Sequence, residues 1–237
     1  MKNKYAKKIL EEVKSDYNRI AGHFSKTRAY FWPDAKFLLD YIKEGDSVLD
    51  LGCGNGRAFR EIKERGAEYV GVDFSEELIK EAKFIHPEGN FKVANALQLP
   101  FVDEFFDKIY CFAVLHHIPS KQLRKQFMEE AQRVLKPGGS LILTVWDSWS
   151  NPRAKKVLFR NRLKKLFFAS SLGWNDVFYL WKDAEGEILA KRYVHMFKEG
   201  ELVKLAKQLG LEIINSGKIQ KIGNENGNIY LVAKKSR

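Results

Sequence analysis

Three glycines that follow a short apolar run form the part of the sequence best suited to ligand chemistry. The run at residues 48–51 contains an acid, Asp50, and leads directly into Gly52, Gly54 and Gly56 and a helix-forming stretch. This pattern predicts a buried parallel strand, a tight turn and a helix start, the geometry that brings backbone close to a ligand. Glycine allows positive φ and removes the Cβ where a ligand approaches. A plain strand–turn–helix connection is the structural alternative.

Further positions fall where an adenosine-containing ligand would need them. Asp73 ends the next apolar run, 21 residues after Gly52, and suits a carboxylate that accepts hydrogen bonds from ribose hydroxyls. Asn95 follows the third run and would meet an adenine edge, while residues 111–115 would wall the pocket. All lie at carboxyl ends of predicted strands, where open α/β sheets bind ligands. Taken singly, Asp73 is compatible with a helix cap, Asn95 with a turn and residues 111–115 with the core. Taken together, they favour a ligand site.

The elements that must position these residues alternate along the chain. We expect strands at residues 48–51, 69–73, 91–94, 106–112, 140–146, 211–215 and 228–233. Helical periods are found at residues 3–22, 33–41, 58–65, 121–135 and 199–209, with Ser75 capping another helix. Residues 174–197 are aromatic and irregular. The predicted fold is α/β, a Rossmann-like, mostly parallel seven-stranded sheet in the order 3-2-1-4-5-7-6 with the last strand antiparallel and helices on both faces.

Length and composition favour one domain with additions. A chain of 237 residues that is 45% hydrophobic can bury one substantial core. We expect N-terminal helices at 1–44, a ligand-binding core at 45–147, a basic and aromatic insertion at 148–198, and a C-terminal helix and strand pair at 199–237. The start lacks a secretory signal and no apolar run has membrane-spanning length. Cys53 and Cys111 have no metal-ligand spacing, so we expect a cytoplasmic protein without a metal.

The positive charge is concentrated in the insertion. The formal net charge is +11, and between Ser148 and Asn175 there is no acid. The cations there are Arg153, Lys155, Lys156, Arg160, Arg162, Lys164 and Lys165. A polyanion, with nucleic acid ahead of membrane, is the expected partner, although a solvated helix face is the ordinary alternative.

The glycine turn separates two kinds of nucleotide-dependent enzyme. It has the form Gly-x-Gly-x-Gly rather than Gly-x-Gly-x-x-Gly, and Asp50 would repel a pyrophosphate while favouring a cationic amino group. A nicotinamide dehydrogenase therefore ranks last. The segments at 49–56, 71–75, 95–101 and 133–139 resemble the class I S-adenosylmethionine-dependent methyltransferases. That resemblance covers residues 48–146.

A narrower resemblance spans nearly the whole chain. Segments at 17–28, 32–33, 113–119, 176–181, 192–202 and 227–230 are similar to the eukaryotic tRNA wobble-uridine methyltransferases. The chain departs from that family's pattern at Leu180, Val194 and Ile229. The resemblance implies formation of the methyl ester of 5-carboxymethyluridine at wobble position 34. It also implies S-adenosyl-L-methionine as cofactor and tRNA as substrate, with a small zinc-binding activator subunit at the sheet edge as partner.

The resemblance assigns candidate residues. The cofactor would be held by Tyr17, Arg28, Asp50, Gly52, Cys53, Gly54, Gly56, Asp73, Phe74, Asn95, Ala96, Leu97, Cys111, Ala113 and His116. A carboxylate is already ionised at neutral pH, so no general base is expected and catalysis would rest on positioning the substrate. The candidates for positioning are Arg28, His116, Arg192, Tyr193 and His195. Trp146 and Trp181 would stack on substrate or belong to the core, and the seven cations of the insertion would contact tRNA phosphates.

Two other functions are compatible with the same residues. One is a small-molecule S-adenosylmethionine-dependent methyltransferase whose basic stretch is only solvated. The other is a catalytically inactive tRNA-binding protein that keeps the fold.

Overall fold

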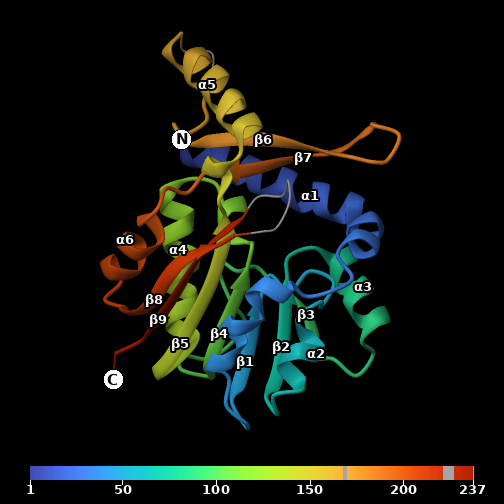
Figure 1. Ribbon diagram of the computed structural model, residues 1–237, viewed down its shortest axis with the longest axis vertical. Coiled ribbons are helices and arrows are strands. Elements are labelled where there is room, and N and C mark those ends of the chain that lie inside the picture. The colour runs from blue at the N-terminus through green and yellow to red at the C-terminus, as the bar shows by residue number, and fades with distance from the viewer. Residues whose placement is uncertain (168–169, 221–226, 237) are drawn as a thin grey trace.

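The computed structural model describes residues 1–167, 170–220 and 227–236, and its centre is a seven-stranded sheet (Figure 1). The strands, in their order across the sheet, are β3 (Phe91–Val93), β2 (Glu68–Asp73), β1 (Ser47–Leu51), β4 (Phe106–Phe112), β5 (Leu135–Trp146), β9 (Asn228–Lys234) and β8 (Glu212–Ile219). Strands β1 to β5 pair in parallel, and β9 is antiparallel to both of its neighbours. The predicted fold class and strand order are confirmed.

Helices cover both faces of this sheet. The helices in the described part of the chain are α1 (Asn3–Thr27), α2 (Phe59–Lys63), α3 (Glu76–Ile85), α4 (Lys121–Val134), α5 (Pro152–Leu166) and α6 (Glu201–Gln208), with 3-10 helices at Pro33–Tyr41, Leu115–His117 and Ser148–Ser150. On one face α4 and α6 bury Phe127 and Leu202 against the strands. On the other face the 3-10 helix Pro33–Tyr41 and α2 bury Leu38 and Ile62. The two cores hold the parallel strands so that their carboxyl ends meet at one edge.

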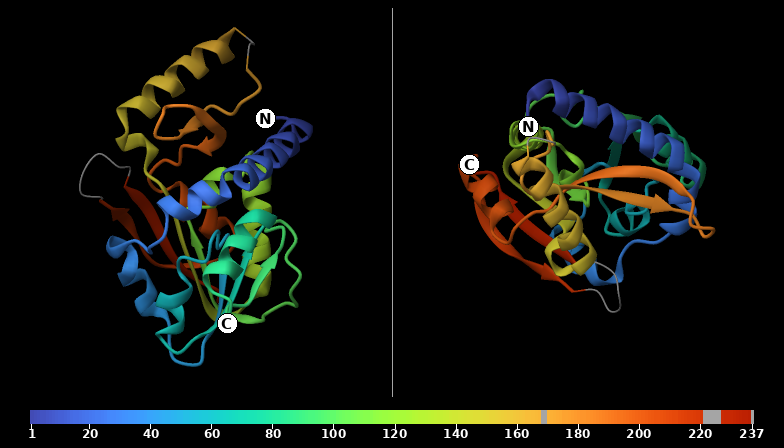
Figure 2. Two further views of the ribbon diagram at one scale, coloured as in Figure 1. Left: turned by 90° about the vertical axis from the view of Figure 1, so that its right-hand side faces the viewer. Right: turned by 90° about the horizontal axis from the view of Figure 1, so that it is seen from above.

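The main difference from the prediction lies at residues 174–197. Instead of an irregular segment, β6 (Asp176–Lys182) and β7 (Ile188–His195) form an antiparallel hairpin, a second sheet of its own. The hairpin lies over the carboxyl ends of the main strands beside α1 (Figures 1 and 2). Helix α1 extends to Thr27, five residues beyond the predicted end, and it packs Val13 and Tyr17 against Trp181 and Tyr193 of the hairpin. Together α1 and the hairpin form a cover.

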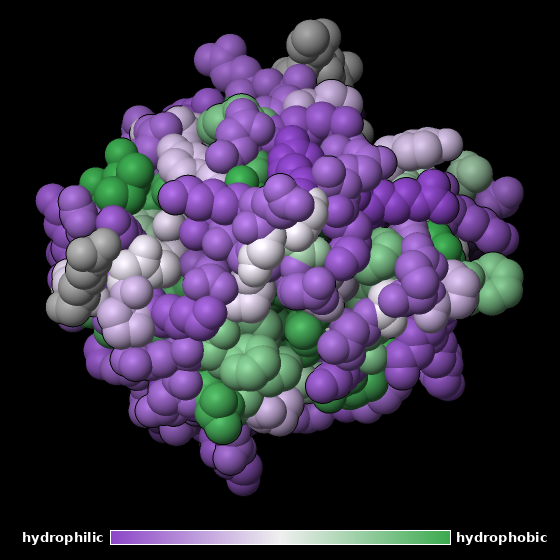
Figure 3. Space-filling view, turned by 90° about the horizontal axis from the view of Figure 1, so that it is seen from below, coloured by the Kyte–Doolittle hydropathy of each residue, from purple (hydrophilic) through white to green (hydrophobic). Residues whose placement is uncertain are grey.

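The helix that follows β2 is capped as predicted. The Ser75 hydroxyl accepts a hydrogen bond from the Leu78 amide at 3.2 Å, which places the start of α3 directly after β2. Helix α5 projects above the hairpin, away from the main sheet (Figure 1). Within the described part of the chain, none of the helices combines the length and apolar character that crossing a membrane requires. Seen from below, the surface is mostly hydrophilic (Figure 3).

Candidate functional site

The glycine turn after β1 is locked between neighbouring backbone and side chains. The amides of Gly52 and Cys53 both donate to the carbonyl of Val72, at 2.7 and 2.9 Å. Gly52 has φ of +82°, and a Cβ there would lie 2.3 Å from Cγ2 of Val114. Gly54 also has positive φ, and its Cβ would touch Phe24 of α1 at 3.4 Å. Side chains at these positions would therefore fill or distort the space that the turn leaves open.

That space is a cavity of about 520 Å³ between the carboxyl ends of the strands and the cover, a size typical of small-molecule sites. Most of the predicted cofactor residues line it: Tyr17, Arg28, Asp50, Gly52, Cys53, Gly54, Asp73, Phe74, Asn95, Ala96, Leu97 and Ala113. Three others, Gly56, Cys111 and His116, do not line it. Gly56 instead leaves room for Phe91, whose ring would be 2.8 Å from an added Cβ, and Cys111 is fully buried in β4.

Two carboxylates lie at the ends of β1 and β2. Asp50 is 2% exposed and accepts a hydrogen bond from the Tyr69 hydroxyl at 2.9 Å. Burial raises the pKa of Asp50 to about 7, against the opposing effects of Tyr69 and Arg57. Asp73 accepts from the amides of Gly54 and Ser75, at 3.0 and 2.9 Å, and burial raises its pKa to about 6. A bound cation would compensate the buried charge of Asp50, and hydroxyl donors would satisfy the remaining lone pairs of Asp73.

Arg57 is a cavity residue that the sequence analysis missed. It follows the glycine turn, and its guanidinium lies over the Trp32 ring, 3.9 Å from the ring centroid. Burial and the charge of Arg28 lower the pKa of Arg57 to about 10, while Asp50 acts in the opposite direction. Within the described residues Arg57 makes no ion pair, so its guanidinium is available to an anionic ligand group beside Asp50. The chemistry of this end therefore fits an amino acid moiety, with one cationic and one anionic group.

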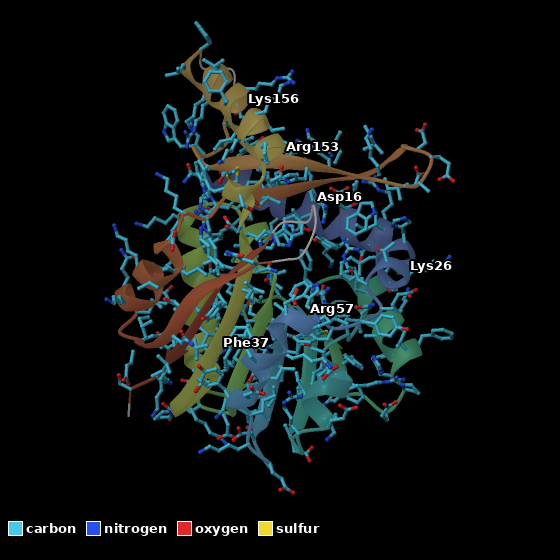
Figure 4. The ribbon with its side chains drawn as sticks, in the orientation of Figure 1. Asp16, Lys26, Phe37, Arg57, Arg153 and Lys156 are labelled. Carbon is cyan, nitrogen blue, oxygen red and sulfur yellow. The ribbon has the colours of Figure 1, made fainter. Side chains whose placement is uncertain are left out.

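The opposite end of the cavity is aromatic and cationic. The Arg192 guanidinium lies between the rings of Trp181 and Trp146, at 4.4 and 5.0 Å from their centroids. Its Nε is buried and has no hydrogen-bond partner among the described residues. Arg153, from the start of α5, lines the same cavity, and Figure 4 places it near α5, above Arg57. A buried donor without an acceptor is costly, so this end is suited to an anionic ligand.

His117 links the cover to the strand ends in a defined protonation state. Its Nδ1 is 2.7 Å from the Tyr193 carbonyl, which only accepts, so Nδ1 carries the proton. Its Nε2 then accepts from the Tyr17 hydroxyl at 2.8 Å. Burial and the charge of Arg192 lower the pKa of His117 to about 3, so the imidazole is neutral at physiological pH. Nearby Ala113, at the end of β4, has φ of +59° and is held by Thr144.

Three of the predicted positioning residues do not reach the cavity. His116 has no exposed surface and packs on His117 and Trp146. The Tyr193 ring is also fully buried, and only its carbonyl acts near the site, through His117. His195 lies between Asp176 and Glu201, at 2.7 and 2.8 Å from their carboxylates. These side chains build the wall behind the cavity, whereas Arg28 and Arg192 line it.

The basic residues of the insertion fall into two groups on α5. Lys155, Lys156 and Arg160 are exposed, in addition to Arg153. Arg162 instead donates to the Trp174 carbonyl and the Asn175 side chain, and Lys165 donates to the Leu172 carbonyl. Arg162 and Lys165 therefore hold the segment that leads into β6. The side chain of Lys164 lies outside the described part of the structure. Among the described residues, no group of three or more His, Cys, Asp or Glu could hold a metal ion.

These features define the class I methyltransferase architecture. They are a mostly parallel α/β sheet, a glycine turn after β1, acids at the ends of β1 and β2, and a cavity end suited to an amino acid moiety. Comparison of this chain with known protein families and solved structures agrees with this class. Residues 49–143 match the family model described as a methyltransferase domain. A protein of Encephalitozoon cuniculi named as a methyltransferase is 31% identical over 204 residues, covering 85% of this chain and 87% of that protein. The chain belongs to the S-adenosylmethionine-dependent methyltransferases, and its cofactor is S-adenosylmethionine.

Two further kinds of relative refine this placement. The tRNA (carboxymethyluridine(34)-5-O)-methyltransferase of Arabidopsis thaliana is 40% identical over 140 residues, 59% of this chain; the chain spans about a third of that protein's length, 33%. A solved S-adenosylmethionine-dependent methyltransferase of Methanosarcina mazei has a TM-score of 0.73 at 27% identity, covering 87% of this chain and 99% of that one. A Haloferax volcanii complex of the Trm112 activator with a methyltransferase has a TM-score of 0.68 at 18% identity, covering 95% and 98%. The last likeness concerns the fold alone.

Proposed function

We propose that the protein transfers a methyl group from S-adenosylmethionine to the carboxylate of 5-carboxymethyluridine at the wobble position of tRNA. The observation that carries this proposal is the arrangement of Arg28, Arg153 and Arg192 on the cavity wall, where no carboxylate of the described residues pairs with them. Such a cluster suits an anionic acceptor, and the flanking rings of Trp146 and Tyr179 suit a planar base. The name of the Arabidopsis relative describes the same acceptor chemistry.

The site residues would promote the reaction by position rather than by proton transfer. S-adenosylmethionine supplies a methyl group on a positively charged sulfur. Asp50 and Asp73 would hold its amino and ribose groups, and Arg57 its carboxylate. The guanidinium of Arg192 would orient the acceptor carboxylate, which is ionised at neutral pH because its ordinary pKa is about 4. Neutral His117 has no base role in this scheme; it fixes Tyr17, and the cover excludes water.

The test is nucleoside mass spectrometry of tRNA after incubation with the protein and methyl-labelled S-adenosylmethionine. We expect one labelled methyl ester on 5-carboxymethyluridine, and none on tRNA that lacks this nucleoside. Label in a metabolite but not in tRNA would favour a small-molecule methyltransferase. Cofactor binding without transfer to either would contradict the proposal.

We propose further that residues 1–237 act as one methyltransferase domain in which the exposed cations of α5 contact tRNA phosphates. The support is that α1, the hairpin and the start of α5 all contribute to the same cavity wall. Because Arg162 and Lys165 hold the segment before β6, the phosphate contacts are proposed for Lys155, Lys156 and Arg160.

A small zinc-binding activator subunit of the Trm112 kind is the proposed protein partner, docked at the β3 edge of the sheet. Exposed apolar side chains lie on and beside this edge: Phe84, Val93, Val102 and Phe105 are 87%, 46%, 69% and 47% exposed. Apolar groups are visible on this side at the right-hand rim of Figure 3. An uncovered strand edge with apolar flanks favours addition of a partner strand.

A matched pair of variants tests this docking edge. Val93→Asp would abolish co-purification with the activator, because it places a charge on the docking edge. Ile214→Asp, at a residue 46% exposed on the opposite edge strand β8, would leave it unchanged. Equal loss of the complex in both variants would contradict the proposed edge.

A further inference from the structure

A second, open groove lies outside the methyl-transfer cavity, between the end of α1 and the end of β6. Its volume is about 280 Å³. Arg28, Leu180, Trp181 and Arg192 line both the groove and the cavity, so the two spaces are neighbours that share these side chains. His23, Thr27 and Lys182 line the groove alone. No acid lines it.

Trp181 organises the cations of this groove. The guanidiniums of Arg28 and Arg192 lie 5.4 and 4.4 Å from its ring centroid. Its indole is 6% exposed, so the ring acts as a support for the guanidiniums rather than as a free stacking platform. Lys182, the next residue of β6, is exposed and makes no ion pair within the described part of the chain. Three positive charges thus face one groove.

His23 adds an uncharged hydrogen-bond donor, its Nε2–H. The indole N–H of Trp181 can only donate, and it lies 2.9 Å from Nδ1 of His23. Nδ1 is therefore the acceptor, and neutral His23 carries its proton on Nε2. No hydrogen bond to Nε2 is made by the described residues. The Thr27 hydroxyl, by contrast, donates to the His23 carbonyl at 2.9 Å, so its oxygen retains acceptor capacity only.

We propose that this groove is a subsite for the phosphodiester that flanks the target nucleotide. The inference rests on the proposed function, because it requires a polynucleotide substrate. A base in the cavity must leave its sugar–phosphate chain outside, and the groove borders the cavity at Arg192 and Trp181, beside the proposed position of the base. A phosphate accepts from several donors at once, which matches the guanidinium of Arg28, the ammonium of Lys182 and Nε2–H of His23.

The geometry makes this subsite distinct from the basic surface of α5. Arg153 borders the cavity from the start of α5, whereas Lys182 belongs to the hairpin and borders only the groove. The RNA backbone would therefore be held on both sides of the target nucleotide. The exposed lysines of α5 would bind it on one side, and the groove at the end of α1 would bind it on the other. That arrangement favours a single-stranded loop over a continuous duplex.

The test measures affinity for a stem–loop RNA that carries 5-carboxymethyluridine in its loop, at about 0.15 M salt. Each of the two phosphodiesters that flank the target is replaced in turn by a neutral methylphosphonate. In the wild-type protein we expect one replacement to weaken binding about fivefold. In Lys182→Glu the same replacement would cost nothing further, and Lys182→Gln would give an intermediate loss. Lys191→Glu, the same charge change at an exposed residue of the partner strand β7, would retain the full fivefold loss.

The outcomes separate the subsite from the proposed function. Affinity for S-adenosylmethionine, measured by calorimetry, should be unchanged in all three variants, which shows that they fold. Equal losses in Lys182→Glu, Lys191→Glu and wild-type protein, or no loss in the wild-type protein, would overturn the subsite. If the stem–loop is methylated in that case, the proposed function survives alone; if no RNA is methylated, both fail.

Discussion

Replacing Gly52 with alanine tests whether the glycine turn is set by the steric limits described above. The residue has φ of +82°, a conformation that costs a side chain roughly 1–2 kcal/mol. The new Cβ would also lie 2.3 Å from Cγ2 of Val114, and relieving such overpacking costs about 1–3 kcal/mol. Gly52→Ala should therefore destabilise the cofactor-free protein by about 2–5 kcal/mol, measured by urea unfolding.

The two contributions can be separated with a double variant. Val114→Ala removes the clashing methyl groups, so Gly52→Ala in that background should cost only the conformational part, about 1–2 kcal/mol. Gly22 of α1 is the control: φ is not positive, and beyond its chain neighbours and the local backbone of its own helix no atom of the described residues lies within 4 Å of its added Cβ. Gly22→Ala should stabilise the helix by about 0.5–1 kcal/mol. A Gly52→Ala cost below about 0.5 kcal/mol, or no relief by Val114→Ala, would refute the reasoning.

Three further predictions concern the ligands. A bound cation favours ionised Asp50, whose pKa without ligand is about 7, so affinity for S-adenosylmethionine should rise with pH up to about 7 and then level off. Calorimetry should show that Asp50→Asn loses this rise. An unchanged pH dependence in Asp50→Asn would argue against contact between Asp50 and the cationic amino group. Arg192→Lys should lower kcat/KM for tRNA about 10–100-fold with unchanged cofactor affinity, because an ammonium cannot form the bidentate contact; parallel loss of both would place Arg192 at the cofactor. Lys156→Glu on α5 should weaken tRNA binding and reduce the salt slope by about 1, whereas Lys207→Glu on α6 should not, and equal effects would indicate non-specific attraction.

The sequence predicts the central sheet well because its signals are local. Each parallel strand is a short apolar run, and glycines and acids mark its carboxyl end, as at Asp50 and Asp73. The cavity follows from the same signals, because the ends of parallel strands meet at one edge of the sheet. Twelve of the fifteen proposed cofactor residues line the cavity, and ten of them lie at or just after strand ends; the other two, Tyr17 and Arg28, belong to α1 and its C-cap.

The cover is harder to predict because its contacts join distant parts of the chain. The β6–β7 strands lack clean alternation, since both of their faces are partly covered, one by α1 and one by α5. His195 has the type and context of a substrate ligand, but Asp176 and Glu201 surround it, 19 and 6 residues away. Arg57 is the opposite case, because the sequence does not predict a role for it and yet it lines the cavity. Next to Gly56 it resembles an ordinary arginine at a helix start, and its position is defined by contact with the distant Trp32 ring.

The cover of α1 and the hairpin lies outside the alternating strands and helices, yet it supplies Arg28, Trp181 and Arg192. Under the proposed function, the strand ends would hold most of the methyl donor, and the hairpin would hold the acceptor. Changes in the hairpin between β5 and α6 can redirect such an enzyme to a new acceptor while the donor's seat is inherited intact. In this architecture a new acceptor specificity therefore requires changes in the β6–β7 hairpin, whereas the glycine turn and the strand ends can stay the same.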